Sequence, residues 1–210
     1  MYITCLDLEG VLVPEIWIAF AEYTKIEALK ATTRDIPDYN QLMRQRLQLL
    51  DEQNFGLSDI QGVISKMKPL PGALDFLNWL KQKSQVIILS DTFYEFAEPL
   101  MQQLNSPTLF CNNLIISSNG KVEDYILREQ DGKRRAVKAL HELNFKVIAA
   151  GDSYNDTTML KEADAGIFFR PPQNIVDEFP QFPVAQNYIE FKLAIERAEK
   201  NLNFELQPAI

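Results

Sequence analysis

Short apolar runs alternate with amphipathic helical segments over most of this chain of 210 residues. The clearest runs cover residues 2–6, 85–89 and 146–150, and polar residues follow each of them. Runs this short and this apolar indicate strands that are buried on both faces. Because strands and helices alternate, the order predicts an α/β fold with a parallel, doubly wound sheet and right-handed crossovers.

The segment after residue 71 follows the same alternation to its end. Helices are expected over 72–83, 93–104, 133–144, 155–163 and about 188–200, and a last short strand over 165–169. Residues 109–117 and 121–128 are expected to pair as a hairpin, because Asn119-Gly120 between them is a strong turn signal. The proline-rich residues 170–172 and 179–183 are expected to form ordered loops.

Residues 14–70 interrupt this alternation with helical patterns alone. Helices are expected over 15–31, 39–53 and 57–66. Pro14 is compatible with the start of the first, because a proline in the first helical turn loses no intrahelical hydrogen bond. We therefore expect an α/β core formed by residues 1–13 and 71–210, with a helical cap of residues 14–70 inserted after the first strand.

Charge and composition exclude several classes of protein. The chain has 21 basic and 29 acidic residues, and this net charge of −8 leaves no basic footprint for nucleic acid or an anionic membrane. No apolar run approaches the roughly 20 residues of a membrane span, and no signal-peptide pattern is present. The chain has two cysteines, Cys5 and Cys111, and one histidine, His141. These numbers exclude a disulfide framework and a multi-histidine zinc site. We expect a cytoplasmic protein in which His141 is structural or lies on the surface.

Polar residues lie at the carboxyl ends of the three buried strands. Asp7 and Glu9 follow the first, Ser90-Asp91-Thr92 the second, and residues 151–156 the third. Ligands of open α/β sheets bind at this edge, so we expect the three segments to line one crevice. An ionised carboxylate that leaves water needs a cation, hydrogen bonds or a chemical function. The alternative is that Asp7 and Glu9 mark the end of the strand and face water.

The acidic residues of these segments suit a metal ion and a nucleophile. Asp7, Asp152 and Asp156 offer the hard oxygen ligands that Mg²⁺ prefers. Asp7 and Glu9 would point to the same side of the strand. That arrangement suits a carboxylate nucleophile with an acid/base partner.

The remaining polar residues suit a phosphate group. Ser90 and the amides that follow it lie at the start of a helix, where phosphate oxygens are well received. Lys133 can supply positive charge to the same phosphate. Alternatively, Lys133, Arg134 and Arg135 form a solvated run of charge. Nucleophile, metal ligands, hydroxyl and lysine together indicate phosphoryl transfer.

The order of these motifs resembles the haloacid dehalogenase superfamily of aspartyl phosphotransferases. The motifs are Asp7-Leu-Glu-Gly-Val-Leu, Ser90-Asp-Thr, Lys133 and Gly151-Asp-Ser-Tyr-Asn-Asp. The insert after the first strand matches the helical cap of that superfamily in position and size. Within the superfamily the chain is similar to the phosphoserine phosphatases, and most similar to their phosphoserine:homoserine phosphotransferase branch. Residues 6–17, 31–39 and 150–160 carry this closer likeness.

The resemblance implies a role for each acidic residue of the strand ends. It makes Asp7 the nucleophile that accepts the phosphoryl group and Glu9 the acid/base carboxylate. It also implies that Asp7, Asp152 and the backbone carbonyl of Glu9 bind Mg²⁺, with Asp156 supporting the metal site. This acid/base position is usually an aspartate, and the extra methylene of Glu9 extends the carboxyl by roughly 1.5 Å.

The resemblance also implies the residues that bind the phosphate. Ser90, the backbone amide of Asp91 and Lys133 would hold its oxygens, and Asn155 would lie close to the phosphate or the substrate. Phosphoserine phosphatases often have glycines after this serine, where Asp91 and Thr92 stand here. This departure and that at Glu9 fit the phosphotransferase branch.

In the insert, the resemblance implies contacts with the rest of the substrate. Arg46 matches an arginine that binds the α-carboxylate, and Glu15 lies near the glutamate that binds the α-amino group. Tyr39 would form an aromatic wall. For Arg46 the alternative is a surface ion pair with Glu22 or Asp51.

The resemblance therefore implies an Mg²⁺-dependent phosphatase that acts on O-phospho-L-serine through an aspartyl-phosphate on Asp7. Homoserine is expected as a second acceptor of the phosphoryl group, so the expected partners are small molecules. Two alternatives stay open: a phosphatase of another small phosphomonoester, such as a sugar phosphate, and a non-catalytic protein that binds a phosphorylated ligand. The sequence does not determine the oligomeric state.

Overall fold

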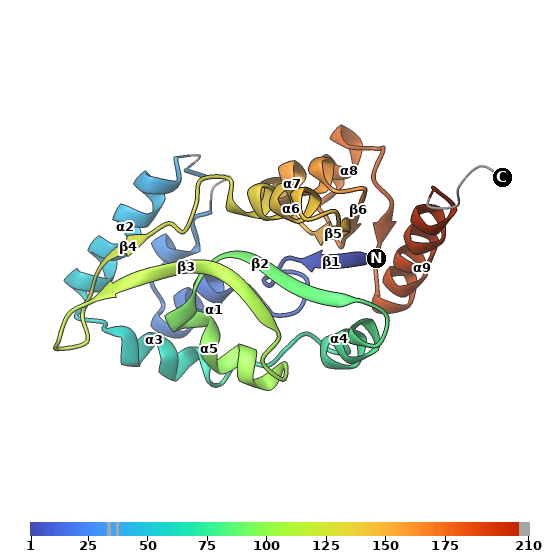
Figure 1. The fold of residues 1–210 in the computed structure, drawn as a ribbon. Helices are drawn as coiled ribbons and strands as arrows, with labels where there is room; N and C mark the ends of the chain where they lie inside the picture. The colour runs from blue at the N-terminus through green and yellow to red at the C-terminus, as the bar shows by residue number, and fades with distance from the viewer. Residues whose placement is uncertain (33–34, 37, 206–210) are drawn as a thin grey trace.

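The computed structural model describes residues 1–32, 35–36 and 38–205, and its centre is a seven-stranded sheet (Figure 1). The strand order is β4-β3-β2-β1-β5-β6-β7. The strands are β1 (Tyr2–Leu6), β2 (Gln85–Phe93), β3 (Thr108–Ile116), β4 (Val122–Ile126), β5 (Lys146–Gly151), β6 (Ala165–Phe169) and β7 (Val184–Ala185). All neighbouring strands are parallel except β3 and β4, which form the predicted hairpin. The predicted doubly wound α/β fold is confirmed.

The register of the central strands brings their carboxyl ends to one level. Leu6, the last residue of β1, pairs with Ile88 of β2 and with Ala150 of β5. The polar residues that follow these positions therefore start from the same edge of the sheet. This edge is where a doubly wound sheet binds its ligands.

Helices cover both faces of the sheet because alternate side chains of each strand point to opposite faces. The helices of the core are α4 (Ala73–Lys81), α5 (Tyr94–Gln103), α6 (Gly132–Glu142), α7 (Thr157–Glu162), α8 (Gln173–Glu178) and α9 (Tyr188–Glu205). Leu6 of β1 packs in one apolar cluster with residues of α4, α5 and α9. Its neighbour Cys5 packs in a second cluster with residues of α6, α7 and α8. Figure 1 shows these two groups of helices on either side of the strands.

The insert contains α1 (Ile16–Thr24), the 3₁₀ helix η1 (Glu27–Lys30), α2 (Tyr39–Glu52) and α3 (Leu57–Ile64). The single helix predicted over 15–31 is wrong. The chain leaves the helix at Lys25, whose φ of 61° lies in the left-handed region, and then forms the 3₁₀ turn. Of the segment 31–39, residues 33, 34 and 37 lie outside the described residues.

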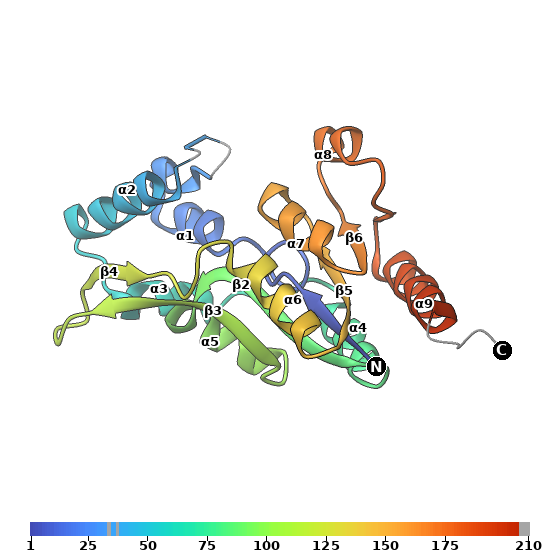
Figure 2. The same ribbon diagram turned by 45° about the horizontal axis from the view of Figure 1, so that its top comes forward.

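The β3–β4 hairpin reaches from the sheet to the insert, and both ribbon views show it beside α2 and α3 (Figure 2). The backbone amide of Leu57 donates to the carbonyl of Gly120 at the tip of the hairpin, at 2.9 Å. Lys121 pairs with Asp51 at 2.5 Å, and Arg44 pairs with Asp124 at 3.1 Å. The insert therefore rests on a part of the core that is distant in sequence.

Four further elements differ from the sequence prediction. β2 continues beyond residue 89 to Phe93, and its pairing with β3 shifts register between these positions. The prediction that Ser90 lies at the start of a helix is therefore wrong, because α5 begins only at Tyr94. The helix predicted over 155–163 is divided into the 3₁₀ turn η2 (Tyr154–Asp156) and α7. The sequence prediction missed α8 and β7, which have six and two residues and are too short to show a periodicity.

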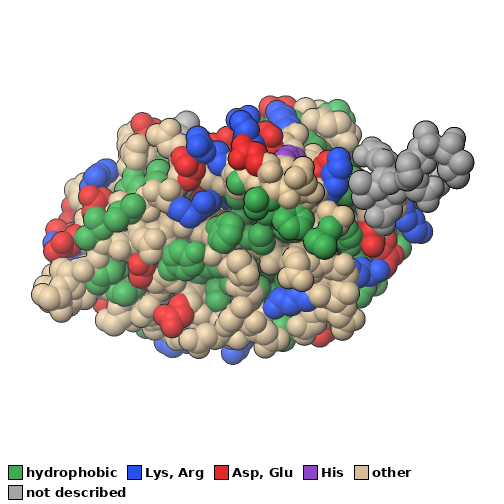
Figure 3. Space-filling model, viewed as in Figure 1, with side chains coloured by type: hydrophobic (Ala, Val, Ile, Leu, Met, Phe, Trp, Pro, Cys, Tyr) green, Lys and Arg blue, Asp and Glu red, His purple; other side chains and the backbone are tan. Residues whose placement is uncertain are grey.

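Cys5 and Cys111 are both buried and free. Within the described part of the chain, every helix is too short or too polar to cross a membrane. On the face seen in Figure 3, the Lys and Arg side chains are interspersed with Asp and Glu side chains.

Candidate active site

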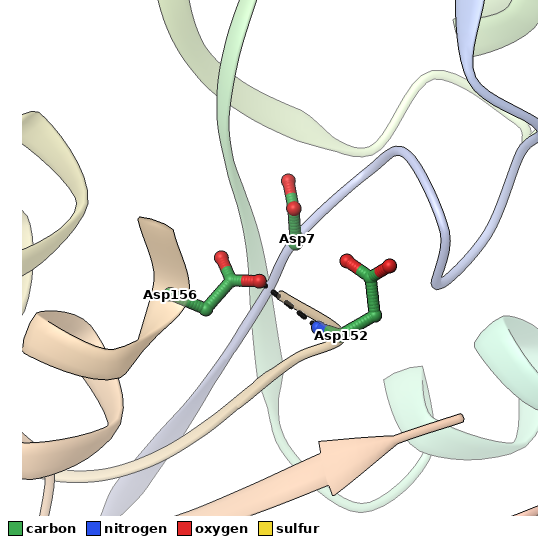
Figure 4. A group of neighbouring side chains, drawn as sticks. All are labelled: Asp7, Asp152 and Asp156. Atoms are coloured by element: carbon green, nitrogen blue, oxygen red, sulfur yellow. Dashed lines mark hydrogen bonds between the residues drawn. The ribbon is translucent and has the colours of Figure 1, made fainter. Parts of the chain in front are cut away.

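Three carboxylates meet at the carboxyl edge of the sheet (Figure 4). Asp7 directly follows β1, and its backbone amide donates to the carbonyl of Ala150 in β5 at 2.9 Å. Asp152 follows β5, and Asp156 ends the 3₁₀ turn η2. One carboxylate oxygen of each aspartate lies within 4.8 Å of those of the other two. The sheet therefore brings together residues from two segments of the chain.

Asp156 is held by the backbone of the loop that carries Asp152. Its Oδ2 accepts hydrogen bonds from the amides of Asp152, at 2.9 Å, and Ser153, at 3.1 Å. Gly151 makes this approach possible, because a Cβ at that position would lie 2.1 Å from Cγ of Asp156. The loop thus places a fully buried carboxylate beneath the strand ends.

A second glycine brings the loop after β1 against Asp152. Gly10 has a φ of +72°, and a Cβ there would lie 2.3 Å from Oδ2 of Asp152. The loop closes on itself through the amide of Gly10, which donates to the carbonyl of Val13 at 2.9 Å. Only glycine meets both the conformation and the close approach.

Lys133 is the cation that faces this acidic cluster. Its buried ammonium lies 2.7 Å from Asp156, 2.9 Å from Asp7 and 3.6 Å from Asp91. The next two residues, Arg134 and Arg135, are exposed and pair with Glu162 and Glu129 on the surface. The alternative of a solvated charge run is therefore wrong for Lys133. Burial alone would lower the pKa of Lys133, but the carboxylates outweigh it and the pKa is raised.

The cluster carries more negative charge than Lys133 neutralises. Burial, and then repulsion by Asp156, raise the pKa of Asp7 well above its usual value and that of Asp152 to about 7. A second cation would relieve this repulsion. The donors are all carboxylate oxygens, which favour a hard divalent ion over zinc or copper. The three aspartates therefore fit a metal ion of the magnesium type.

Glu9 and Glu15 lie together and line the same cavity as Asp7. Oε2 of Glu9 accepts a hydrogen bond of 2.7 Å from the amide of Ile16 at the start of α1. Burial, and then the charge of Glu15, raise the pKa of Glu9 to about 8. A hydrogen bond with Glu15 also favours the protonated form of Glu9. At neutral pH, Glu9 is therefore able to hold a proton that it can donate.

The predicted residues surround one cavity of about 340 Å³, which is the size of a site for a small molecule. Eight of the nine predicted site residues line it: Asp7, Glu9, Glu15, Arg46, Ser90, Asp91, Lys133 and Asn155. The ninth, Asp152, lies beside Asp7 in the acidic cluster. The cavity is bounded by the strand ends on one side and by the insert on the other.

Asp91 connects the second strand end to the third and to the insert. Nδ2 of Asn155 donates to its carboxylate at 2.8 Å, and the hydroxyl of Tyr39 donates to its carbonyl at 3.3 Å. The buried Ser90 accepts a hydrogen bond of 3.3 Å from the amide of Thr92. Because the Asp91 carboxylate also lies 3.6 Å from the ammonium of Lys133, this strand end is linked to the acidic cluster.

Arg46 lies on the insert side of the cavity and is buried. Its Nη2 donates to the carbonyl of Ala31 at 2.9 Å, and its guanidinium lies over the ring of Trp17. Among the described residues, Nε has no hydrogen-bond partner and no carboxylate forms an ion pair with Arg46. The predicted alternative of a surface ion pair is therefore wrong, and Asp51 pairs with Lys121 instead. Burial lowers the pKa of Arg46 to about 10, and an anion in the cavity would compensate its charge.

Several residues of the cavity wall were not predicted from the sequence. They are Trp17, Ile18, Thr32, Leu42, Thr92, Ser153 and Tyr154. The segment 150–160, which carries part of the family resemblance, already contained Ser153 and Tyr154. For α1 and α2, no local pattern distinguishes a wall residue from a core residue. The predicted aromatic wall residue, Tyr39, does line the cavity.

Comparison with known proteins agrees with this fold. A family model of the haloacid dehalogenase-like hydrolases matches residues 5–164. A buried aspartate cluster at the edge of a doubly wound sheet and this match define the class: the chain belongs to the haloacid dehalogenase-like hydrolases, within their phosphoserine phosphatase family.

Two phosphoserine phosphatases are similar to this chain over most of its length. It is 62% identical to "Phosphoserine phosphatase ThrH" of Pseudomonas aeruginosa over 91% of this chain and 94% of that protein. It is also 62% identical to "Phosphoserine phosphatase" of Pseudomonas syringae pv. tomato over 90% of this chain and 80% of that protein. The crystal structure of phosphoserine phosphatase from T. onnurineus has the same fold, with a TM-score of 0.72 and 22% identity over 90% of this chain and 92% of that one.

Proposed function

We propose that this protein is an Mg²⁺-dependent phosphoserine phosphatase that works through an aspartyl-phosphate on Asp7 and also transfers the phosphoryl group to homoserine. One observation carries the proposal. At one end of the cavity lies an acidic cluster with Lys133. At the other lies the buried Arg46, whose Nε has no hydrogen-bond partner among the described residues. A phosphate at the first end and a carboxylate at the second match the two anionic groups of phosphoserine. The names of the 62% identical relatives support the same substrate.

In this proposal Asp7, Asp152 and the backbone carbonyl of Glu9 would hold Mg²⁺, with Asp156 as support. The bound ion would supply positive charge that reduces repulsion between the phosphate and Asp7. Asp156 also orients Lys133, since its two oxygens bind the ammonium and the amides of the Asp152 loop. The position of Lys133 therefore depends on the same carboxylate that closes the metal site.

Asp7 attacks phosphorus, and the bond between phosphorus and the serine oxygen breaks. Lys133, Ser90 and the amide of Asp91 hold the phosphate oxygens during this step. Glu9 is protonated at neutral pH and gives its proton to the leaving serine oxygen. The Glu9 carboxylate then takes a proton from the acceptor, whose oxygen attacks the phosphorus and releases Asp7.

The insert binds the amino-acid part of the substrate. Arg46 would hold the α-carboxylate, and Glu15 the α-amino group, while Asn155 contacts the phosphate end. We propose that residues 14–70 form a cap. Its closure over the cavity would decide whether water or homoserine reaches Asp7. A cytoplasmic location is part of the proposal and is checked by cell fractionation.

The variant Asp7→Asn tests the core of the proposal. It is expected to abolish phosphate release from phosphoserine, because the amide is not a nucleophile at phosphorus. The exposed Asp75 on α4 offers a matched control, and Asp75→Asn is expected to keep full activity. If Asp7→Asn still releases phosphate from phosphoserine, the proposal is wrong. Labelled phosphate traced from phosphoserine, with and without homoserine, separates the transferase from the hydrolase.

The alternatives make different predictions. If the substrate is a sugar phosphate, Arg46→Ala leaves activity on it intact, whereas phosphoserine turnover is expected to fall in our proposal. If the protein only binds a phosphorylated ligand, no inorganic phosphate is released from any member of a substrate panel.

A further inference from the structure

The guanidinium of Arg46 lies over an aromatic ring. Its Cζ is 4.5 Å from the centroid of the Trp17 ring, which lies on α1, whereas Arg46 lies on α2. Trp17 also lines the cavity. An aromatic face attracts a cation, and the attraction is stronger when water is excluded. The contact thus joins two helices of the insert at the wall of the cavity.

Two further contacts hold the guanidinium of Arg46 in place. Nη2 donates to the carbonyl of Ala31 at 2.9 Å, and Nη1 contacts Sδ of Met43 at 3.8 Å. Nε is buried and has no partner within the described part of the chain. The N–H donors of a guanidinium lie in its plane, so the Trp17 ring over one face leaves them able to bind a ligand at the edge of the group. A planar carboxylate is the anion that such a fork binds through two parallel hydrogen bonds.

Trp17 is itself held by the core. Its ring packs edge-on against Phe96 of α5, at 5.4 Å between centroids, and against Phe20, at 6.5 Å. Both phenylalanines are almost fully buried. The orientation of Trp17, over which Arg46 lies, is therefore fixed in part by α5, a helix outside the insert.

We infer that Trp17 is a positioning residue that makes Arg46 selective for the α-carboxylate of an amino-acid phosphomonoester. This inference rests on the proposed function and adds a specificity determinant to it. Trp17 restricts the guanidinium to one orientation, so that the carboxylate binds an arginine that is already ordered. The chemistry at Asp7 does not depend on this contact.

Kinetics with two substrates test the inference. O-phosphoethanolamine has the phosphate and the amine of phosphoserine but lacks its α-carboxylate. Trp17→Leu is expected to raise KM for phosphoserine about 10-fold, with kcat nearly unchanged, and to leave KM for phosphoethanolamine unchanged. Trp17→Phe keeps an aromatic face and is expected to restore most of the affinity. Trp79→Leu replaces the other tryptophan, on α4, and is expected to alter neither constant.

A fluorescence measurement tests it without removing Trp17. The chain has two tryptophans, so Trp79→Phe leaves Trp17 as the only indole. In the double variant Asp7→Asn/Trp79→Phe, saturating phosphoserine is expected to change the Trp17 emission. The reason is that the carboxylate of phosphoserine binds the Arg46 guanidinium that lies over the Trp17 ring. Saturating phosphoethanolamine is expected to cause a much smaller change.

The outcomes separate the inference from the proposed function. Equal effects of Trp17→Leu on both substrates, or equal emission changes with both ligands, would overturn the role of Trp17. If the wild-type protein does not cleave phosphoserine, the proposed function fails. The emission difference between the two ligands still decides whether Trp17 and Arg46 recognise a carboxylate.

Discussion

The hydroxyl of Tyr188 donates a hydrogen bond of 2.7 Å to the backbone carbonyl of Val11. Val11 is fully buried in the loop that contains Glu9 and Gly10, and Tyr188 is the first residue of α9. The Tyr188 ring stacks between Phe76, at 5.0 Å, and Phe169, at 4.8 Å. The C-terminal helix therefore supports the loop that follows the proposed nucleophile.

Replacing Tyr188 by phenylalanine leaves the Val11 carbonyl buried without this donor. We expect Tyr188→Phe to lower the free energy of unfolding by about 1–3 kcal/mol, measured by urea denaturation. Tyr23 is 60% exposed and serves as the control, since Tyr23→Phe should change stability by less than about 0.5 kcal/mol. Equal losses in the two variants would mean that the hydrogen bond to Val11 contributes nothing.

Two glycines of opposite character predict opposite effects of alanine. Gly10→Ala adds a Cβ 2.3 Å from Asp152 and retains a positive φ, so it should destabilise the protein and abolish phosphatase activity. Gly62 lies in α3, is exposed, and has no atom within 4 Å of a Cβ. Gly62→Ala should therefore stabilise the protein by roughly 0.5–1 kcal/mol and keep full activity. A wild-type-like Gly10→Ala variant would contradict the tight packing of this loop on Asp152.

Magnesium is expected to stabilise the protein by binding the folded state alone. At about 100 times its dissociation constant, a bound ion adds about 2.7 kcal/mol, which thermal unfolding detects as a rise in Tm. Asp152→Asn should lose most of this rise. Without metal, the same variant should be at least as stable as the wild type, because it removes one of the crowded carboxylates. Identical magnesium responses in the two proteins would place the ion elsewhere.

A carboxylate distant from the cavity should make stability depend on pH. Asp164 accepts hydrogen bonds from Lys146 at 2.8 Å, His141 at 2.9 Å and the amide of Val147 at 2.8 Å. Burial opposes ionisation, but these bonds outweigh it and hold the pKa of Asp164 below its usual 3.8. Its contribution is therefore complete above the unfolded pKa and is lost as the pH falls through the lower folded pKa.

The comparison of wild type with Asp164→Asn checks this sign. The difference in free energy of unfolding should be larger at about pH 6 than at about pH 3, as measured by urea denaturation at each pH. A difference that grows as the pH falls would contradict the assignment. The contact with Asp164 also agrees with the structural role expected for His141.

Local sequence patterns predicted most of the strands and helices, and they also identified the candidate site residues. The apolar runs and the Asn119-Gly120 turn are signals that lie within a few residues, and the structure has strands and a hairpin there. The break at Lys25 was missed, because a left-handed residue other than glycine has no clear signal in a helical pattern. The continuation of β2 to Phe93 was missed because its pairing partner lies in β3.

Periodicity and strand-end chemistry are properties of neighbouring residues, and they were enough to predict the order of the elements and the polar ends of the strands. The burial of Lys133 beside the exposed Arg134 and Arg135 became evident only in the folded chain. The same is true of Arg46, which lies against Trp17 rather than beside Asp51. Burial and charge pairing depend on side chains that are far apart in the chain, and the packing of sheet and helices brings them together.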